Sequence, residues 1–111
     1  IGDAILDVAH NEDGFIKLVS ALKWRFPDEK FDVVAGFSPT KDWESCLDRI
    51  RPIAETIRLV APHPRLLSLG DLTLEKALQI GKKRKVVCGS FYLMEEARRI
   101  LHQGSSFAAT K

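Results

Sequence analysis

Four short apolar runs rich in β-branched residues alternate with four stretches of helical periodicity, and this alternation is what most constrains the fold. The predicted strands cover residues 4–9, 31–37, 56–60 and 85–88. After each strand, apolar residues recur every three or four positions, over 15–26, 43–54, 74–80 and 91–102. Strict alternation favours parallel strands joined by right-handed crossovers. We therefore expect an α/β fold: a three-layer, Rossmann-like domain with a mainly parallel sheet and helices on both faces.

Glycine and polar residues mark the expected ends of the helices. Gly81 is predicted to close the third helix and Gly104 to stop the last one, which leaves 104–111 as a flexible tail. Each of the first three helices is preceded by two candidate N-caps: Asn11 or Asp13, Thr40 or Asp42, and Asp71 or Thr73.

The composition is that of one folded domain. The chain has 111 residues, of which 45% are apolar and 29% charged, so a disordered or fibrous protein is excluded. Its formal net charge of +2 is too small to indicate a nucleic-acid partner. The basic residues cluster only at 82–85, where a solvated loop is favoured over a phosphate-binding patch. No apolar run approaches the roughly 18 residues of a membrane helix.

The two cysteines and the first residue bear on the origin of the chain. Cys46 and Cys88 lie inside apolar patterns without CxxC spacing, so we expect reduced core thiols in a cytoplasmic protein. The chain begins at Ile1 rather than at Met and enters a strand almost at once. We expect residues 1–111 to be a single domain of a longer protein.

Polar residues follow the strands, at the edge of the sheet where ligands bind in open α/β folds. The predicted exits are residues 7–11, 38–42, 61–65 and 88–90. Asp7 either caps its turn or accepts hydrogen bonds from sugar hydroxyls. His10 precedes a helix, and the helix N-terminus favours the neutral ring, which can donate or accept a hydrogen bond. The alternative is that His10 is a loop residue without a functional role. Ser90 is either a plain N-cap or part of an anion site at a helix start.

Several common catalytic and binding patterns are missing. No GxGxxG follows the first strand and there is no GxxxxGK[ST], which argues against a dinucleotide fold and a P-loop. His10, His63 and His102 are too scattered for a metal site, and no nucleophile-elbow context is present. Neither metal binding nor covalent hydrolysis is therefore predicted.

Two motifs near opposite ends of the chain carry a family resemblance. Leu6-Asp7-Val8-Ala9-His10-Asn11, closed by Gly14, follows the first strand, and Gly89-Ser90-Phe91-Tyr92-Leu93 precedes the last helix. They resemble the C-terminal domain of the folylpolyglutamate synthase and dihydrofolate synthase family, within the Mur ligase superfamily, whose turns read Asp-x-Ala-His-Asn-Pro and Gly-Ser-Leu-Tyr-Leu. Between them, Val33-Val34-Ala35-Gly36 followed by Lys41-Asp42 is similar to the family's strand ending in Lys-Asp. The likeness spans Ile5 to about Leu101.

The resemblance implies an ATP-dependent amide ligase. In this family, ATP phosphorylates a carboxylate of dihydropteroate or of a folate glutamyl tail, and the amine of L-glutamate displaces the phosphate. A preceding central domain supplies the P-loop and the Mg²⁺ ligands, so this chain alone would be inactive. By position, Asp7 would contact the ATP ribose and Asn11 would also bind the cofactor. His10 would be the catalytic residue near the phosphates, and Ser90 would hold glutamate.

The chain also departs from the family pattern. Glu12 stands where Pro is usual and Phe91 where Leu is usual, and the segment 60–86 is shorter than expected. One alternative is the C-terminal domain of a peptidoglycan Mur ligase, whose turn reads Asp-Tyr-Ala-His. Another is a stand-alone nucleotide- or amino-acid-binding module.

Overall fold

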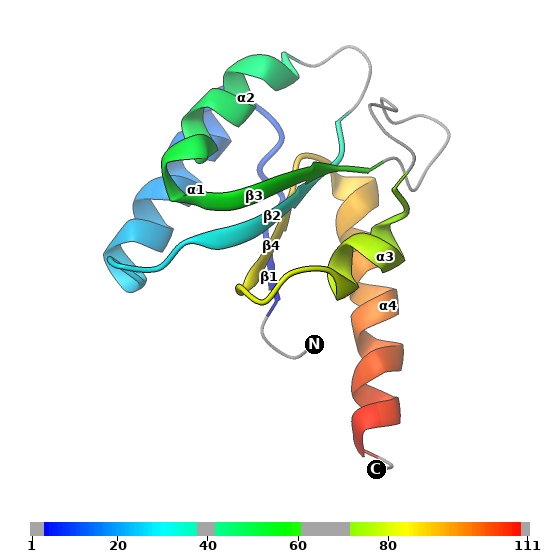
Figure 1. Cartoon of the computed structure of the whole chain (residues 1–111). Coiled ribbons are helices and arrows are strands. Elements are labelled where there is room, and N and C mark those ends of the chain that lie inside the picture. Colours follow the sequence, from blue (N-terminus) through cyan, green and yellow to red (C-terminus); the bar gives the residue numbers. More distant parts are fainter. Residues whose placement is uncertain (1–3, 38–41, 61–71, 110–111) are drawn as a thin grey trace.

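Strands and helices alternate along the whole described chain, as the sequence predicts. The computed structural model describes residues 4–37, 42–60 and 72–109, with the backbone only for 91, 92 and 103–109 (Figure 1). The elements in chain order are β1 (Ile5–Leu6), α1 (Glu12–Arg25), β2 (Phe31–Ala35), α2 (Trp43–Ile50), the 3-10 turn η1 (Arg51–Ile53), β3 (Ala54–Leu59), α3 (Leu74–Gln79), β4 (Lys85–Cys88) and α4 (Phe91–Ala109).

The four strands form one sheet in the order β1-β4-β2-β3, and every pair is parallel. The central strands β2 and β4 are the most buried, with Val33 beside Val86 and Val34 beside Val87. Strands covered on both faces read as continuous apolar runs, which explains the absence of polar alternation in both segments.

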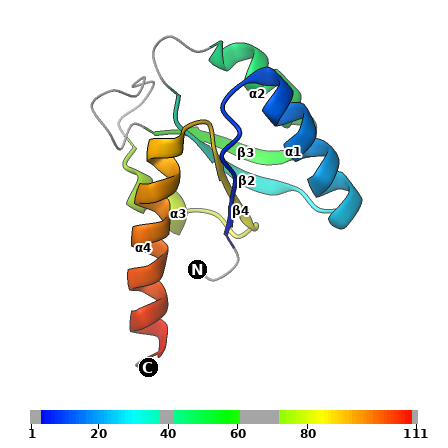
Figure 2. The same cartoon turned by 180° about the vertical axis from the view of Figure 1, so that it is seen from behind.

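Helices cover both faces of the sheet, so the three-layer prediction is confirmed (Figures 1 and 2). Successive residues of a strand point to opposite faces, so Val86 and Cys88 of β4 pack with α1 and α2, whereas Val87 packs with α3 and α4. The larger core includes Phe15, Leu18, Val19 and Leu22 of α1 with Cys46, Leu47 and Ile50 of α2. The smaller one includes Leu74, Ala77 and Leu78 of α3 with Leu93 and Ala97 of α4.

The structure decides between the candidate helix caps. Asn11 Oδ1 accepts a hydrogen bond from Gly14 N at 2.8 Å, and Asp42 Oδ1 accepts one from Ser45 N at 3.4 Å. Thr73 Oγ1 likewise accepts from Lys76 N at 3.2 Å. Each bond satisfies an amide that has no partner inside its own helix, which is why these polar residues start helices.

Two predicted helix ends are wrong. The second helix ends at Ile50 rather than 54, because Pro52 leads into a 3-10 turn and Ala54 begins β3. The last helix continues past Gly104 to Ala109. A helical glycine costs only about 1 kcal/mol relative to alanine, so it weakens a helix without ending it. The predicted flexibility of 104–111 stays a prediction, and its last two residues lie outside the described ones.

Both cysteines are free and buried, as predicted. The run 82–85 precedes β4, and Lys85 is not solvated as the loop prediction requires: its side chain is only 11% exposed. Within the described ranges, no helix is both long and apolar enough to cross a membrane. The predicted exits at 38–41 and 61–65, with His63, lie outside the described residues.

Candidate functional site

Asp7 leaves β1 at the carboxyl edge of the sheet. Its amide donates to the carbonyl of Val87 at 3.0 Å, and its Oδ1 accepts from Ala9 N at 2.8 Å. Asp7 is half-buried. The carboxylate therefore fixes its own turn through Oδ1. Its other oxygen, Oδ2, accepts no hydrogen bond from any residue that the structure describes. Capping and ligand binding, the two readings of Asp7 from sequence, are compatible.

His10 is exposed at the end of the same turn. Its Nδ1 lies 3.0 Å from the carbonyl oxygen of Val8. A carbonyl oxygen only accepts hydrogen bonds, so this contact requires the proton on Nδ1. In the neutral ring Nε2 is then the acceptor, with its lone pair available to a ligand.

Asn11 and Gly14 build the start of α1. The Asn11 side chain is exposed, and its Oδ1 is committed to the Gly14 amide as the helix cap. A Cβ at position 14 would lie 3.1 Å from Asn11 Oδ1 and 3.3 Å from Ala9 Cα. Glycine therefore lets the helix approach the Asp7 turn closely.

The second predicted motif lies directly against the first. Gly89 has φ +106, and a Cβ there would come within 2.5 Å of the Gly36 carbonyl oxygen. Its amide donates to the carbonyl of Ala9 at 2.7 Å, which joins the turn after β4 to the turn after β1. The predicted convergence of these two strand exits is confirmed.

Ser90 follows at the start of α4, which begins next to the Asp7 turn. It is only 7% exposed, and its carbonyl accepts from Met94 N at 3.2 Å. The residue is thus part of the helix start and lies largely beneath the surface.

A hollow of about 310 Å³ lies over the first turn and α1. Asp7, His10 and Asn11 line it, and Ser90 does not. Lys17 also lines it, although the sequence reasoning missed this residue. Its position three residues after Gly14, on the same side of the helix, was the available signal. Its Nζ pairs with Asp13 at 3.2 Å, and both side chains are exposed.

Two neighbouring groups are excluded from the chemistry of the hollow. Burial raises the pKa of the Cys88 thiol, and the nearby Asp7 carboxylate and Cys46 raise it further, so the thiol stays neutral. Glu12 pairs with Arg49 of α2, at 2.8 Å from Nε and 2.7 Å from Nη2. This ion pair connects the start of α1 to α2. It gives a structural role to Glu12, which stands where the resembling family usually has Pro. Among the described residues, no three His, Cys, Asp or Glu side chains form a potential metal site.

The fold and the site define a class of protein: a parallel α/β domain whose first and last strand exits form one polar edge. The chain is 29% identical over 120 residues to folylpolyglutamate synthase from Lacticaseibacillus casei, covering 92% of this chain and 28% of that protein. It is 34% identical over 68 residues to dihydrofolate synthase/folylpolyglutamate synthase from Bacillus subtilis strain 168, covering 60% of this chain and 16% of that protein. No protein-family model matches the chain.

Solved structures agree with these relatives. The crystal structure of folylpolyglutamate synthase from Thermotoga maritima has a TM-score of 0.83 and 27% identity, covering 91% of this chain and 28% of that chain. The bifunctional folylpolyglutamate synthase/dihydrofolate synthase from Yersinia pestis, complexed with AMPPNP and a Mn ion, has a TM-score of 0.74 and 26% identity, covering 89% of this chain and 28% of that chain. The resemblance to part of folylpolyglutamate synthase and dihydrofolate synthase is confirmed in sequence and in fold. The chain spans less than a third of the length of these relatives.

Proposed function

We propose that the chain is the C-terminal domain of an ATP-dependent amide ligase that acts in the cytoplasm. The parent enzyme would add L-glutamate to dihydropteroate or to the glutamyl tail of folate through an acyl phosphate. One observation carries the proposal: Gly89 N bonds to Ala9 O at 2.7 Å, which joins the two motifs that resemble the family. The likeness to folylpolyglutamate synthases in sequence and fold supports it.

The first turn fits a nucleotide. Asp7 Oδ2 can accept hydrogen bonds from ribose hydroxyls, while Oδ1 keeps the turn in shape. His10 and Asn11 line the same hollow and would contact the phosphate side of the cofactor. The complex of the Yersinia pestis relative with AMPPNP and Mn supports nucleotide and metal use. The described residues offer no cluster of metal ligands, so we assign Mg²⁺ and the P-loop to a preceding central domain.

The turn after β4 fits the amino-acid substrate. The first amides of a long helix have no partners within it, and they favour negative charge. We assign Ser90 and this helix start to a carboxylate of glutamate. Because Ser90 is largely buried, it would act mainly by fixing the shape of the turn.

The chemistry that ATP supplies is activation of the substrate carboxylate as an acyl phosphate. The residues of this chain position the reactants and accept a proton. His10 Nε2, the acceptor of the neutral ring, would take the proton that the glutamate amine loses as the amide bond forms. Closure of the domain over the nucleotide would exclude water from the acyl phosphate.

Kinetics of the complete parent protein test these roles. His10→Ala should lower kcat by about 100-fold, the usual contribution of a positioned acid or base. Asp7→Asn retains an oxygen for the Ala9 amide but loses the charge, and it should raise KM for ATP about tenfold. The readout is ADP release with dihydropteroate or tetrahydrofolate plus glutamate.

The matched control is Asp48→Asn, which removes an exposed carboxylate of α2 that pairs with Arg51 and does not line the hollow at the Asp7 turn. It should leave both kinetic constants and the melting temperature unchanged. Wild-type kinetics in both site variants would disprove the residue assignments. Absence of any folate-dependent ADP release would disprove the ligase proposal itself and would favour a peptidoglycan ligase or a binding module.

A further inference from the structure

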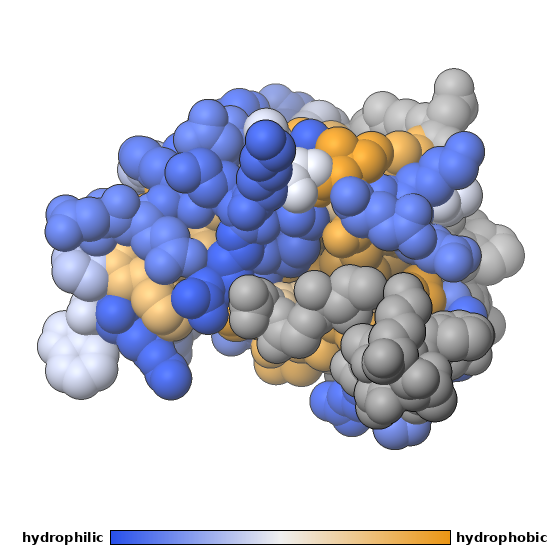
Figure 3. All heavy atoms as spheres, turned by 60° about the horizontal axis from the view of Figure 1, so that its bottom comes forward, coloured by the Kyte–Doolittle hydropathy of each residue, from blue (hydrophilic) through white to orange (hydrophobic). Residues whose placement is uncertain are grey.

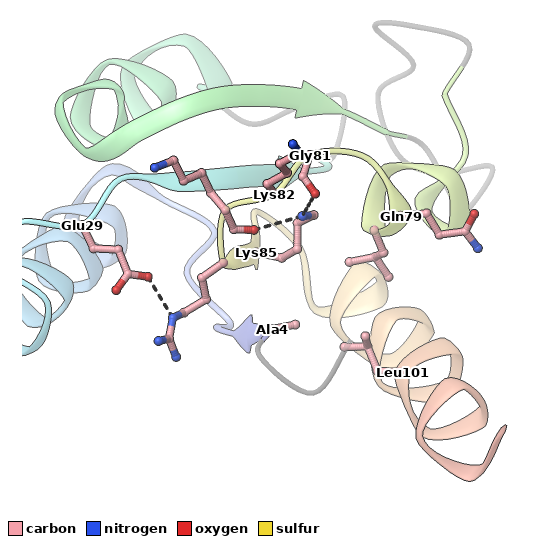
Figure 4. A pocket seen from close by; sticks show the side chains of 10 residues that line it. Ala4, Glu29, Gln79, Gly81, Lys82, Lys85 and Leu101 are labelled. Carbon is pink, nitrogen blue, oxygen red and sulfur yellow. Dashed lines mark hydrogen bonds and ion pairs between the residues drawn. The ribbon is translucent and has the colours of Figure 1, made fainter. Parts of the chain in front are cut away.

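A second hollow, of about 470 Å³, lies at the opposite edge of the sheet, where β4 begins (Figure 4). Four consecutive cations border it: Lys82, Lys83 and Arg84 of the loop between α3 and β4, and Lys85 at the start of β4. Leu78 of α3 and Leu101 of α4 line the same hollow. It shares no residue with the hollow at the Asp7 turn.

Two of the four cations are already neutralised. Lys85 Nζ lies 3.3 Å from Asp32 Oδ2 and donates to the carbonyls of Gly81 and Lys83 at 3.2 and 3.0 Å. Arg84 Nε donates to Glu29 Oε2 at 2.9 Å, and its guanidinium lies 4.5 Å from the centre of the Phe26 ring. These two residues hold the loop in place.

The other two cations are not neutralised. Lys82 and Lys83 are exposed, and neither ammonium group has an ion-pair partner in the part of the chain that the structure describes. Like charges on adjacent residues repel one another. An anion bound by both ammonium groups would offset this repulsion.

The shape of the loop is fixed by Asp32 beneath it. The amide of Lys83 donates to Asp32 Oδ2 at 3.0 Å. Gly81 has φ +87, and a Cβ there would lie 2.2 Å from the same oxygen. The loop therefore wraps closely around a buried carboxylate, and Lys82 and Lys83 project from a backbone whose conformation is already set.

Apolar side chains in the walls of the hollow strengthen the electrostatic attraction of its lysines for anions. Apolar side chains adjoin the hydrophilic band across the face in Figure 3, which views the molecule from below. Glu29 also lines the hollow, but it is paired with Arg84. Within the described residues, the unpaired charges there are therefore those of Lys82 and Lys83. Unpaired charges of one sign beside walls of low dielectric constant attract counter-ions more strongly than charges on an open surface. Leu78 and Leu101 supply such walls here.

We propose that this hollow, which we call the basic hollow, is a second ligand site that takes an anion with two or more negative charges. Lys82 and Lys83 bind the anion, and Arg84 and Lys85 position them. Phosphate and carboxylate groups both suit ammonium donors, so the ligand is a diphosphate-type or a polycarboxylate anion. The site lies at the start of β4, whereas the proposed nucleotide and glutamate site lies at its end.

Titration of the 111-residue chain with inorganic pyrophosphate and with citrate tests the proposal. At low ionic strength, amide NMR shifts should change saturably at 81–85. Lys82→Gln/Lys83→Gln should weaken binding about tenfold or more. The control Lys23→Gln/Lys76→Gln removes the same charge from exposed lysines outside the basic hollow, and binding should change by less than about twofold.

The two probes separate the two sources of the anion. Tighter binding of pyrophosphate assigns the site to phosphorylated ligands, and tighter binding of citrate assigns it to polycarboxylates. Three results would overturn the proposal: no saturable binding of either probe, shifts confined to 7–14 and 89–90, or equal weakening in both double variants.

Discussion

At the scale of single residues, Asp32 is the most informative side chain outside the candidate site. It is 1% exposed and lies at the start of β2. Burial raises the pKa of this carboxyl, but hydrogen bonds from Thr56, Lys85 and the Lys83 amide, together with the charge of Lys85, outweigh burial and hold the pKa below its ordinary 3.8. The ionised form is therefore the one that the fold stabilises.

We expect Asp32→Asn to lower the free energy of unfolding at pH 7 by about 2–4 kcal/mol, because Lys85 would keep a buried charge without its partner. A carboxyl whose pKa is lowered in the folded state stabilises above its unfolded pKa, and the benefit disappears as pH falls through the folded pKa. The difference in the free energy of unfolding between wild type and variant should therefore be constant above about pH 5 and should become smaller below pH 3.8. Urea unfolding across this range measures it. A gap that does not vary with pH would contradict the assignment.

At the scale of elements, the turn between β4 and α4 depends on Gly89. Positive φ costs a residue with a side chain about 1–3 kcal/mol, and at Gly89 the new Cβ would also clash with the Gly36 carbonyl. Gly89→Ala should therefore lower the free energy of unfolding by at least this amount and weaken the Gly89–Ala9 bond. The measurements are thermal unfolding and hydrogen exchange of the Gly89 amide.

Gly104→Ala is the matched control, because it adds the same methyl group to a glycine inside α4. It should stabilise the chain by up to about 1 kcal/mol, since alanine is the better helix former. Equal melting temperatures for Gly89→Ala and wild type would show that the turn has room for a side chain.

Local signals predicted most of the elements. β4 begins and ends at the predicted residues, and the caps Asn11, Asp42 and Thr73 were each among the candidates. The last helix was predicted too short because glycine was read as a stop signal. The low helix propensity of glycine costs only about 1 kcal/mol, which is too little to end a helix by itself.

At the scale of the whole molecule, the order of the strands in the sheet could not be predicted from the sequence. Lys85 was predicted to be solvated, yet it pairs with Asp32 because β4 lies beside β2 with these residues in register. Sequence reasoning brought Asp7, His10 and Ser90 to one edge. It could not foresee that Gly89 bonds to Ala9 or that Ser90 is buried, since both follow from β1 lying beside β4.

The central place of β4 leads to a prediction for truncated chains. A chain ending at residue 84 lacks the strand that lies between β1 and β2, and it loses the buried side chains Val86, Val87 and Cys88. We expect it to show no cooperative unfolding transition in urea by circular dichroism, whereas a chain ending at residue 103 should keep one. A cooperative transition in the shorter chain would mean that the first three strands fold without β4.

The pairing of β1 with β4 also sets when the candidate site forms during synthesis. Ile5 pairs with Val86, so β1 gains its sheet partner only when the fourth strand has emerged from the ribosome. At about 5–20 residues per second, the Asp7 turn waits several seconds for its neighbour. Contacts between residues this distant in sequence are also the slow ones to form in folding. Nascent chains therefore spend that interval with the Asp7 turn already synthesised and the polar edge unformed, because its other half, Gly89 and Ser90, follows β4 in the chain.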